Sequence, residues 1–205
     1  MSAPPVPESP NLTNLREAVQ GCRACELYQG TTQAVFGEGL ARAEVMFVGE
    51  QPGDREHREG HPFVGPAGRM LDKALEEAGI DRKLAYVTNA VKHFRFEERG
   101  KRRIHQRPGS EHIKACRPWL DAELDVVKPR VLVCLGAVAA QGLLGSKVRV
   151  LKDRGKPLES DLAPVVMVTI HPSSILRERD EPARAAAFAG FVDDLKVVAE
   201  AINAP

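Results

Sequence analysis

The stretch EVMFVGE, residues 44–50, places four apolar residues in a row and ends in a glycine and a glutamate. A short apolar run without alternation is typical of a strand that is buried on both faces of a sheet. The segment that follows, residues 68–80, has apolar residues at helical spacing and closes at Gly79. A buried strand followed by a helix is the repeating unit of a parallel α/β fold.

The same alternation continues along the chain. Further strands are predicted over 84–91, 130–136 and 163–170, and further helices over 111–127, 137–145 and 182–202. We therefore predict an α/β protein, a three-layer α/β/α sandwich with a central, four-stranded, mainly parallel sheet. No repeat or linker interrupts the pattern, so residues 1–205 are expected to form a single domain, with the proline-rich residues 1–11 as a disordered lead.

Composition limits the possible partners. The chain has 29 Lys and Arg against 28 Asp and Glu, a formal net charge of +1, so any affinity for nucleic acid must come from a local patch. No apolar run is long enough to span a membrane, and the N-terminus resembles no signal peptide. We expect a monomeric cytoplasmic protein with no membrane partner.

Four cysteines are spread unevenly over the chain. Cys22 and Cys25 form a C-x2-C pair in a segment with a helix-like pattern, whereas Cys116 falls in a predicted helix and Cys134 in a predicted strand. Structural zinc sites usually use two such close pairs. One close pair with two separate cysteines suits a four-cysteine iron–sulfur cluster. Two buried core cysteines beside an accidental C-x2-C are an equally simple interpretation.

Polar and turn-forming residues follow each predicted strand. They are residues 49–53 after the first strand, Asn89 after the second, Gly136 after the third and residues 171–173 after the fourth. Parallel α/β sheets bind ligands at the carboxyl ends of their strands. The sequence therefore predicts an active site at this edge of the sheet.

Residues 49–71 hold the most informative motif, GEQPGDREHREGHPFVGPAGRML. Pro52 and Gly53 predict a turn that presents Glu50 and Asp54. Phe63 precedes small residues that open a helix, whose free N–H groups can bind a phosphate or a carbonyl oxygen. An aromatic side chain beside them can stack on a nucleic-acid base.

These motifs occur in an order that resembles the uracil-DNA glycosylase superfamily. The likeness comprises GE-x-PG at 49–53, PFVG-x-AG at 62–68, the strand-end Asn89 and HPS-x-x-L at 171–176, and it runs from the first cysteine to about residue 195. The cysteine pattern resembles the iron–sulfur, family 4 branch. Gln51 in GEQPG and KRRIH at 101–105 resemble the UdgX subgroup. His57 stands where family members often have an acidic residue, and we assign it no role.

The resemblance implies excision of uracil from DNA, single-stranded DNA above all, with free uracil as a product. Phe63 is expected to stack on the flipped base, Asn89 to read its edge, and His171 to stabilise the charge that develops on it. Glu50 is expected near C1′ of the sugar. Three further residues are expected to line the substrate site: Gly49, Asp54 and Ser173. A [4Fe-4S] cluster is expected on Cys22, Cys25, Cys116 and Cys134.

The resemblance also gives a role to the basic segment at 93–107. In UdgX-type proteins the histidine of KRRIH, here His105, attacks C1′ in place of water and stays attached to the abasic sugar. Glu50 is expected to accept the imidazole proton, either directly or through Gln51, and Arg103 is expected to position the loop. Lys101, Arg102 and Arg177 are expected on DNA phosphates. Ile175 and Leu176 are expected to wedge into the strand where the base flips out.

Three alternatives stay open on the residues alone. Residues 93–107 show no apolar periodicity, which is also typical of a mobile, solvated insertion. A conventional hydrolytic family 4 glycosylase would share the motifs other than Gln51 and KRRIH. A non-catalytic, metal-containing nucleic-acid binding module would explain the cysteines and the cations, although it leaves the polar residues at the strand ends without a role.

Overall fold

A computed structural model describes residues 5–204. The main sheet has five strands in the order β2-β1-β5-β7-β6. Four are parallel, namely β1 (Val45–Gly49), β2 (Ala85–Asn89), β5 (Val131–Leu135) and β7 (Val165–Thr169). These correspond to the four predicted strands, and the α/β sandwich is confirmed. The fifth strand, β6 (Pro157–Leu158), runs antiparallel at the edge, and its two residues are too few to give a visible pattern.

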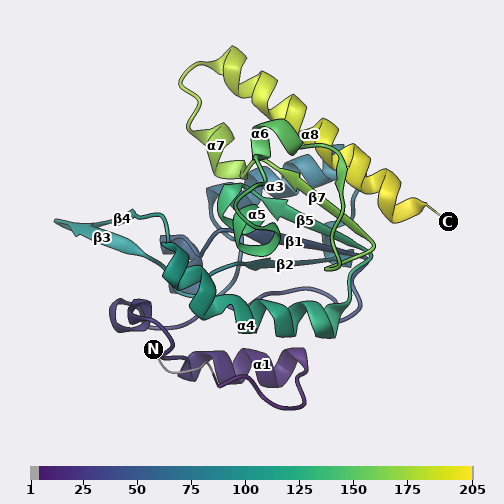
Figure 1. Cartoon of the computed structure of the whole chain (residues 1–205). Helices are drawn as coiled ribbons and strands as arrows, with labels where there is room; N and C mark the ends of the chain where they lie inside the picture. The colour runs from purple at the N-terminus through teal and green to yellow at the C-terminus, as the bar shows by residue number, and fades with distance from the viewer. Residues whose placement is uncertain (1–4, 205) are drawn as a thin grey trace.

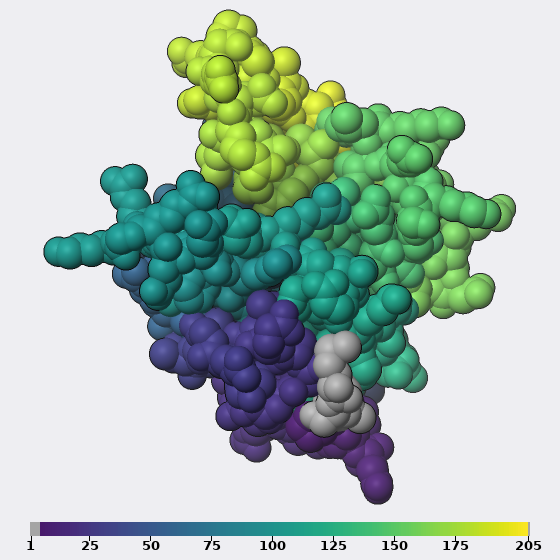
Figure 2. All heavy atoms as spheres, turned by 60° about the vertical axis from the view of Figure 1, so that its left-hand side comes forward, coloured from purple at the N-terminus to yellow at the C-terminus, as the bar shows by residue number. Residues whose placement is uncertain are grey.

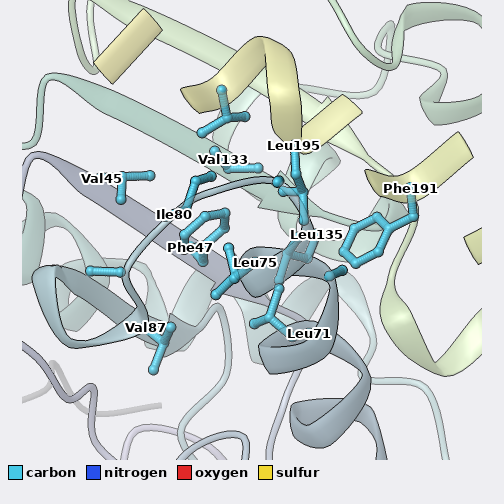
Figure 3. Close-up of a cluster of buried hydrophobic side chains, with 14 of the residues drawn as sticks. Val45, Phe47, Leu71, Leu75, Ile80, Val87, Val133, Leu135, Phe191 and Leu195 are labelled. Atoms are coloured by element: carbon cyan, nitrogen blue, oxygen red, sulfur yellow. The ribbon is translucent and has the colours of Figure 1, made fainter. Parts of the chain in front are cut away.

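Helices cover both faces of the sheet (Figure 1). On one face, α3 (Pro66–Glu77) and α8 (Glu181–Asn203) pack on alternate strand residues, among them Phe47. On the other face, α4 (Ser110–Val127) and α5 (Ala137–Leu144) pack on the intervening residues, among them Met46. Figure 3 shows the first of these cores, where Leu71 and Leu75 of α3 meet Phe191 and Leu195 of α8. Burial on both faces is the reason that the strands read as continuous apolar runs.

A third, smaller core fixes the N-terminal segment to α4. Helix α1 (Leu12–Ala18) is capped by Asn11, and its Leu15 packs with Val19 and Trp119. The 3-10 turns η1 (Val19–Gly21) and η2 (Glu26–Gly30) follow. The predicted helical pattern around the C-x2-C pair is wrong, because the backbone is extended at both cysteines. Of the predicted disordered lead, residues 1–4 lie outside the described part of the chain, and Asn11 already belongs to the α1 cap.

The basic segment forms a β-hairpin and not a loop. Strands β3 (Phe96–Arg99) and β4 (Arg102–His105) pair antiparallel around the turn at Gly100 and Lys101. Figure 2 shows this segment in teal, projecting between the purple N-terminal segment and the yellow-green segment around α7 and the start of α8. Polar strands of four residues carry no hydrophobic alternation, so the sequence pattern could not indicate them.

Four short elements complete the structure. They are α2 (Asp54–Glu59), η3 (Arg82–Leu84), α6 (Val150–Asp153) and α7 (Pro172–Leu176). Two of them, α2 and α7, are the next elements after β1 and β7, so they frame the predicted active-site edge. Within residues 5–204, no helix has the length and apolar character needed to cross a membrane.

Candidate active site

The ends of β1 and β2 bring an amide and an aromatic ring together. Gly49 pairs with Asn89 across the two strands. A Cβ on Gly49 would overlap Asn89 Oδ1 and lie 2.6 Å from Phe63 Cζ. Only a residue without a side chain leaves room for both groups. The predicted neighbours Gly49, Phe63 and Asn89 therefore do share one site.

Phe63 has a strained backbone. Its φ of 57° lies in the left-handed region, which is rare for an aromatic residue and costs about 1–3 kcal/mol. Its carbonyl oxygen is seated against Gly68 in the first turn of α3, at a position where any Cβ would overlap it. The start of α3 therefore holds the Phe63 ring at the strand ends.

Asn89 places its side-chain amide at the strand ends. Asn89 is only 3% exposed, and its Oδ1 lies next to Gly49 at the end of β1. A buried amide in a binding site is suited to hydrogen-bond a ligand. Because the amide has both a donor and an acceptor, it can read two neighbouring groups on a heterocycle.

His171 caps α7 and packs its ring on Phe63, with the ring centroids 6.2 Å apart and 29° between the planes. Its Nδ1 accepts from the backbone N–H of Ser173 at 3.2 Å and lies 2.8 Å from the Ser173 hydroxyl. Burial, with a further contribution from the Arg177 charge, lowers the pKa of His171 to about 4. His171 is therefore neutral at pH 7, and its proton resides on Nε2 as a hydrogen-bond donor.

Glu50 directly follows β1 and is held by its backbone, whose carbonyl accepts from Val91 N at 3.0 Å. Its Oε1 is buried without a hydrogen-bond partner among the described residues. Burial raises the pKa of this carboxyl, and the charges of Arg107 and Arg177 oppose that shift. A buried carboxylate without a donor is suited to stabilise a cation that forms next to it.

The hairpin brings His105 over the strand ends. His105 Nε2 lies 3.7 Å from Glu50 Oε1, and the ring rests on Phe94 with 6.0 Å between centroids. Burial and, to a smaller extent, the charge of Arg177 lower the pKa of His105. The side chain stays 49% exposed. His105 is thus a neutral imidazole that faces both the buried carboxylate and solvent.

Gln51 fastens the base of the hairpin. Its Oε1 accepts from Arg95 N at 3.1 Å, and its Nε2 lies 3.1 Å from Arg95 O, 3.0 Å from Gln106 O and 3.0 Å from His105 Nε2. The amide nitrogen therefore faces His105, so Gln51 cannot accept a proton from it. This orientation contradicts the route through Gln51, and proton acceptance by Glu50 itself stays a prediction. The Gln51 amide nitrogen has two N–H groups, but three acceptors surround it: Arg95 O, Gln106 O and His105 Nε2. The lone pair of His105 Nε2 is therefore only partly used by a hydrogen bond from Gln51.

Arg103 joins the hairpin to α2. Its guanidinium lies 2.5 Å from Asp54 Oδ1 and packs over the Phe96 ring. Asp54 also pairs with Arg58 at 2.8 Å. The Asp54 carboxylate, expected at the substrate, is thus held by two arginines and anchors β4 beside the site.

The other cations lie at different depths. Lys101 and Arg102 are exposed on the hairpin. Arg177 donates to the Ser173 hydroxyl at 3.2 Å and is close enough to affect the pKa values of Glu50, His105 and His171. The expectation of an Ile175 wedge is wrong, because that side chain is fully buried against the core, whereas Leu176 is 40% exposed.

All four cysteines are buried and free. Trp119 Nε1 donates to Cys22 Sγ at 3.3 Å, and Lys92 N donates to Cys116 Sγ at 3.5 Å. Burial raises the pKa of Cys116 to about 12, and the nearby Cys25 and Cys22 contribute in the same direction. Cys22, Cys25 and Cys116 are therefore neighbours.

Comparison with known proteins identifies the family. Residues 36–196 match the uracil DNA glycosylase superfamily. The chain belongs to this superfamily. It is 38% identical over 169 residues to the type-4 uracil-DNA glycosylase of Thermotoga maritima, which covers 82% of this chain and 84% of that protein. Over 176 residues it is 35% identical to the type-4 uracil-DNA glycosylase of Sulfurisphaera tokodaii, and the match covers 81% of this chain and 76% of that protein. Over 175 residues it is 34% identical to the type-4 uracil-DNA glycosylase of Pyrobaculum aerophilum, and the match covers 82% of this chain and 86% of that protein.

These relatives confirm the resemblance of this uracil-DNA glycosylase superfamily member to the type-4 branch. The likeness of Gln51 and KRRIH to the UdgX subgroup stays a prediction. The same holds for the roles of the site residues, which rest on their geometry.

The cysteines fit the expected cluster only in part. Cys134 lies on β5 in a different core, among Met46, Val48 and Val168. Within residues 5–204, no three or more Cys, His, Asp and Glu side chains are arranged as metal ligands. The structure therefore brings three of the four expected cysteines near one another and separates the fourth.

His93 is a buried residue that directly follows Lys92 in the chain, and sequence reasoning missed it. It follows Lys92, whose backbone contacts Cys116 Sγ, and burial together with the charge of Arg23 lowers its pKa to about 4. Arg23 stands between the two cysteines of the C-x2-C pair. A buried histidine right after a buried strand was the signal that could have indicated it.

Proposed function

We propose that this protein excises uracil from DNA and remains covalently attached, through His105, to C1′ of the abasic deoxyribose. The observation that carries the proposal is the position of His105 Nε2, 3.7 Å from the Glu50 carboxylate and at the same strand ends as Asn89 and His171. A hydrolytic glycosylase needs no imidazole at this place.

Recognition of the base uses the free polar groups of the site. The flipped uracil stacks on Phe63. The Asn89 amide donates to O4 and accepts from N3–H, a proton that the cytosine ring lacks. The neutral His171 donates its Nε2–H to O2. As the C1′–N1 bond breaks, N1 keeps the electron pair, and this donor stabilises the developing charge by about 3–4 kcal/mol.

Capture of the sugar uses Glu50 and His105. Loss of uracil leaves an oxocarbenium ion, which the buried Glu50 carboxylate stabilises. The lone pair of His105 Nε2 then forms the bond to C1′, and the imidazole becomes cationic. Its Nδ1 proton leaves to solvent, since the side chain is half exposed, and uracil takes up a proton as it departs. A C1′–N bond to imidazole does not hydrolyse readily, so each molecule reacts once.

DNA is held through its phosphates, with Lys101, Arg102 and Arg177 as the contacts. Single-stranded DNA is the preferred form, because its bases need no unpairing before they enter the pocket. The net charge of +1 makes this local group of cations decisive for affinity.

The cysteine site completes the proposal. A [4Fe-4S] cluster is held by Cys22, Cys25 and Cys116 with His93 as its fourth ligand, in place of Cys134. Thiolate and imidazole are both suitable ligands of iron–sulfur clusters. The cluster supplies cross-linking and not reaction chemistry, since it ties the N-terminal segment to α4 and to the end of β2. Removal of iron should therefore lower stability before it changes the reaction.

The test is a denaturing gel with a labelled single-stranded oligonucleotide that contains one uracil. A band raised by the mass of the protein, resistant to heat and detergent and absent with thymine, supports covalent capture. Oligonucleotide that breaks only after alkali indicates the conventional hydrolytic enzyme that the type-4 relatives also favour. No change of any kind supports a binding module. His105→Ser should release uracil with turnover and form no adduct, and an adduct on that variant would refute the role of His105.

A further inference from the structure

A fully buried ion pair lies below the end of β2. The side chains of Lys92 and Glu123 are both 0% exposed, and Lys92 Nζ contacts Glu123 Oε2 directly. The ammonium group also donates to Thr88 Oγ1 at 2.7 Å and to the backbone carbonyl of Asn89 at 2.9 Å. All three of its N–H groups are therefore used.

Glu123 is equally well satisfied. Its Oε1 accepts from Gly37 N at 3.1 Å, from the Tyr86 hydroxyl at 2.9 Å and from Thr88 Oγ1 at 2.9 Å. Burial and the nearby Glu123 charge raise the pKa of Tyr86, so its hydroxyl stays a donor. The network joins α4 to the last residues of β2.

Stability alone does not explain such a network. Two charges lose much hydration in the interior, and a well-packed apolar pair is often at least as stable. A buried ionic network is better suited to fix one geometry. The geometry fixed here is that of Thr88 and Asn89, which end β2 at the active site.

Lys92 holds Asn89 at the backbone. The Asn89 amide is placed by its backbone, whose carbonyl accepts from Lys92 Nζ at 2.9 Å, and by close packing beside Gly49 and Phe63. Lys92 itself is fixed on both sides, since its N–H donates to Cys116 Sγ and its carbonyl accepts from Val35 N at 2.8 Å. A series of contacts therefore links Cys116, through Lys92, to Asn89, the residue proposed to read the base.

We infer that the Lys92–Glu123 pair is a positioning device that sets the Asn89 amide for recognition of the uracil edge. The inference rests on the proposed excision of uracil by this site. Lys92 and Glu123 touch neither base nor sugar and act only through Asn89.

A double-mutant cycle tests the inference. Lys92→Met/Glu123→Gln removes both charges at similar volume and leaves no orphan charge, and single-turnover uracil release is measured with and without Asn89→Ala. We expect about a 10- to 100-fold loss in the wild-type background, because small misplacements of a recognition group cost that much. In the Asn89→Ala background we expect less than about a twofold further loss. An equal loss in both backgrounds, or no loss in either, would overturn the inference.

Controls separate this result from other causes. Lys73→Met/Glu77→Gln removes an exposed ion pair on α3 and should change nothing. If the buried double variant shows no thermal unfolding transition, Thr88→Val replaces it in the same cycle, because it cuts one link of the network without a change of charge. A wild-type protein that releases no uracil refutes the proposed function. Normal release by a folded network variant refutes only the positioning role.

Discussion

His105 Nε2 lies 3.7 Å from Glu50 Oε1, although His105 ends a strand of the small hairpin and Glu50 follows strand β1 of the main sheet. Burial lowers the pKa of His105 and raises the pKa of Glu50. An imidazole that stays neutral can act as a nucleophile, while a carboxylate without a donor can stabilise a cation. The hairpin therefore adds a reactive nitrogen to a site whose other groups belong to the sheet edge.

Adduct formation should depend on pH in a direction set by these two groups. The reaction needs His105 neutral and Glu50 ionised, so the rate should be constant near pH 7 and fall in acid. Arg177→Gln removes a positive charge that lowers both pKa values. Both pKa values should then rise, and the acid limb should move to higher pH. Single-turnover rates from pH 4 to 8 on saturating DNA measure this shift, and a limb that moves to lower pH would contradict the assignment.

Gln51 should control capture more than excision. Gln51→Ala removes the amide that bonds Arg95, Gln106 and His105, so the base of the hairpin loosens while Asn89, Phe63 and His171 stay in place. We expect uracil release to persist and the adduct yield to fall by about tenfold, which is the scale of one or two lost hydrogen bonds. The ratio of cross-linked DNA to released uracil is the readout, and equal losses in both would argue against this division of roles.

Arg103 and Arg102 are neighbours with different expected effects. Arg103→Met breaks the contact with Asp54 and should lower the adduct yield at saturating DNA. Arg102→Met removes an exposed cation and should weaken DNA binding, with the salt slope reduced by about one, and leave the adduct yield at saturation unchanged. Titrations at several salt concentrations, followed by gels at saturation, compare the two variants. If Arg103→Met reduced the salt slope and Arg102→Met did not, Arg103 and not Arg102 would be the residue that contacts a phosphate.

Gly49→Ala should close the base pocket. The added Cβ would overlap Asn89 Oδ1 and press on the Phe63 ring. We expect a loss of stability of about 1–3 kcal/mol and of nearly all uracil excision. Gly21→Ala is a matched control, because nothing lies within 4 Å of a Cβ there. Excision near the wild-type rate by Gly49→Ala would mean that the base binds elsewhere.

The extent to which the sequence predicted this structure depends on the kind of element. The parallel strands and the main helices were predicted, because continuous apolar runs and helical periodicity reflect burial directly. The hairpin at 96–105 was not, since its polar strands bury little. Asn89 and His171 were placed correctly at the strand ends by topology alone. The contacts of Lys92 and of Asp54 depend on side chains from distant segments, which no local pattern encodes.

The separation of Cys134 from the other cysteines leads to a test of the cluster ligands. Cys134→Ala removes a core side chain from β5 and should cost about 1 kcal/mol of stability, with iron and sulfide content unchanged. Cys116→Ala and His93→Ala should each lower the iron content and the visible absorbance, whereas His93→Cys should retain both, since thiolate is the commonest ligand of such clusters. Iron and sulfide per protein, measured after anaerobic purification, decide between the sets. If Cys134→Ala lost iron and His93→Ala retained all of it, the cluster ligands would be the four cysteines and not three cysteines with His93.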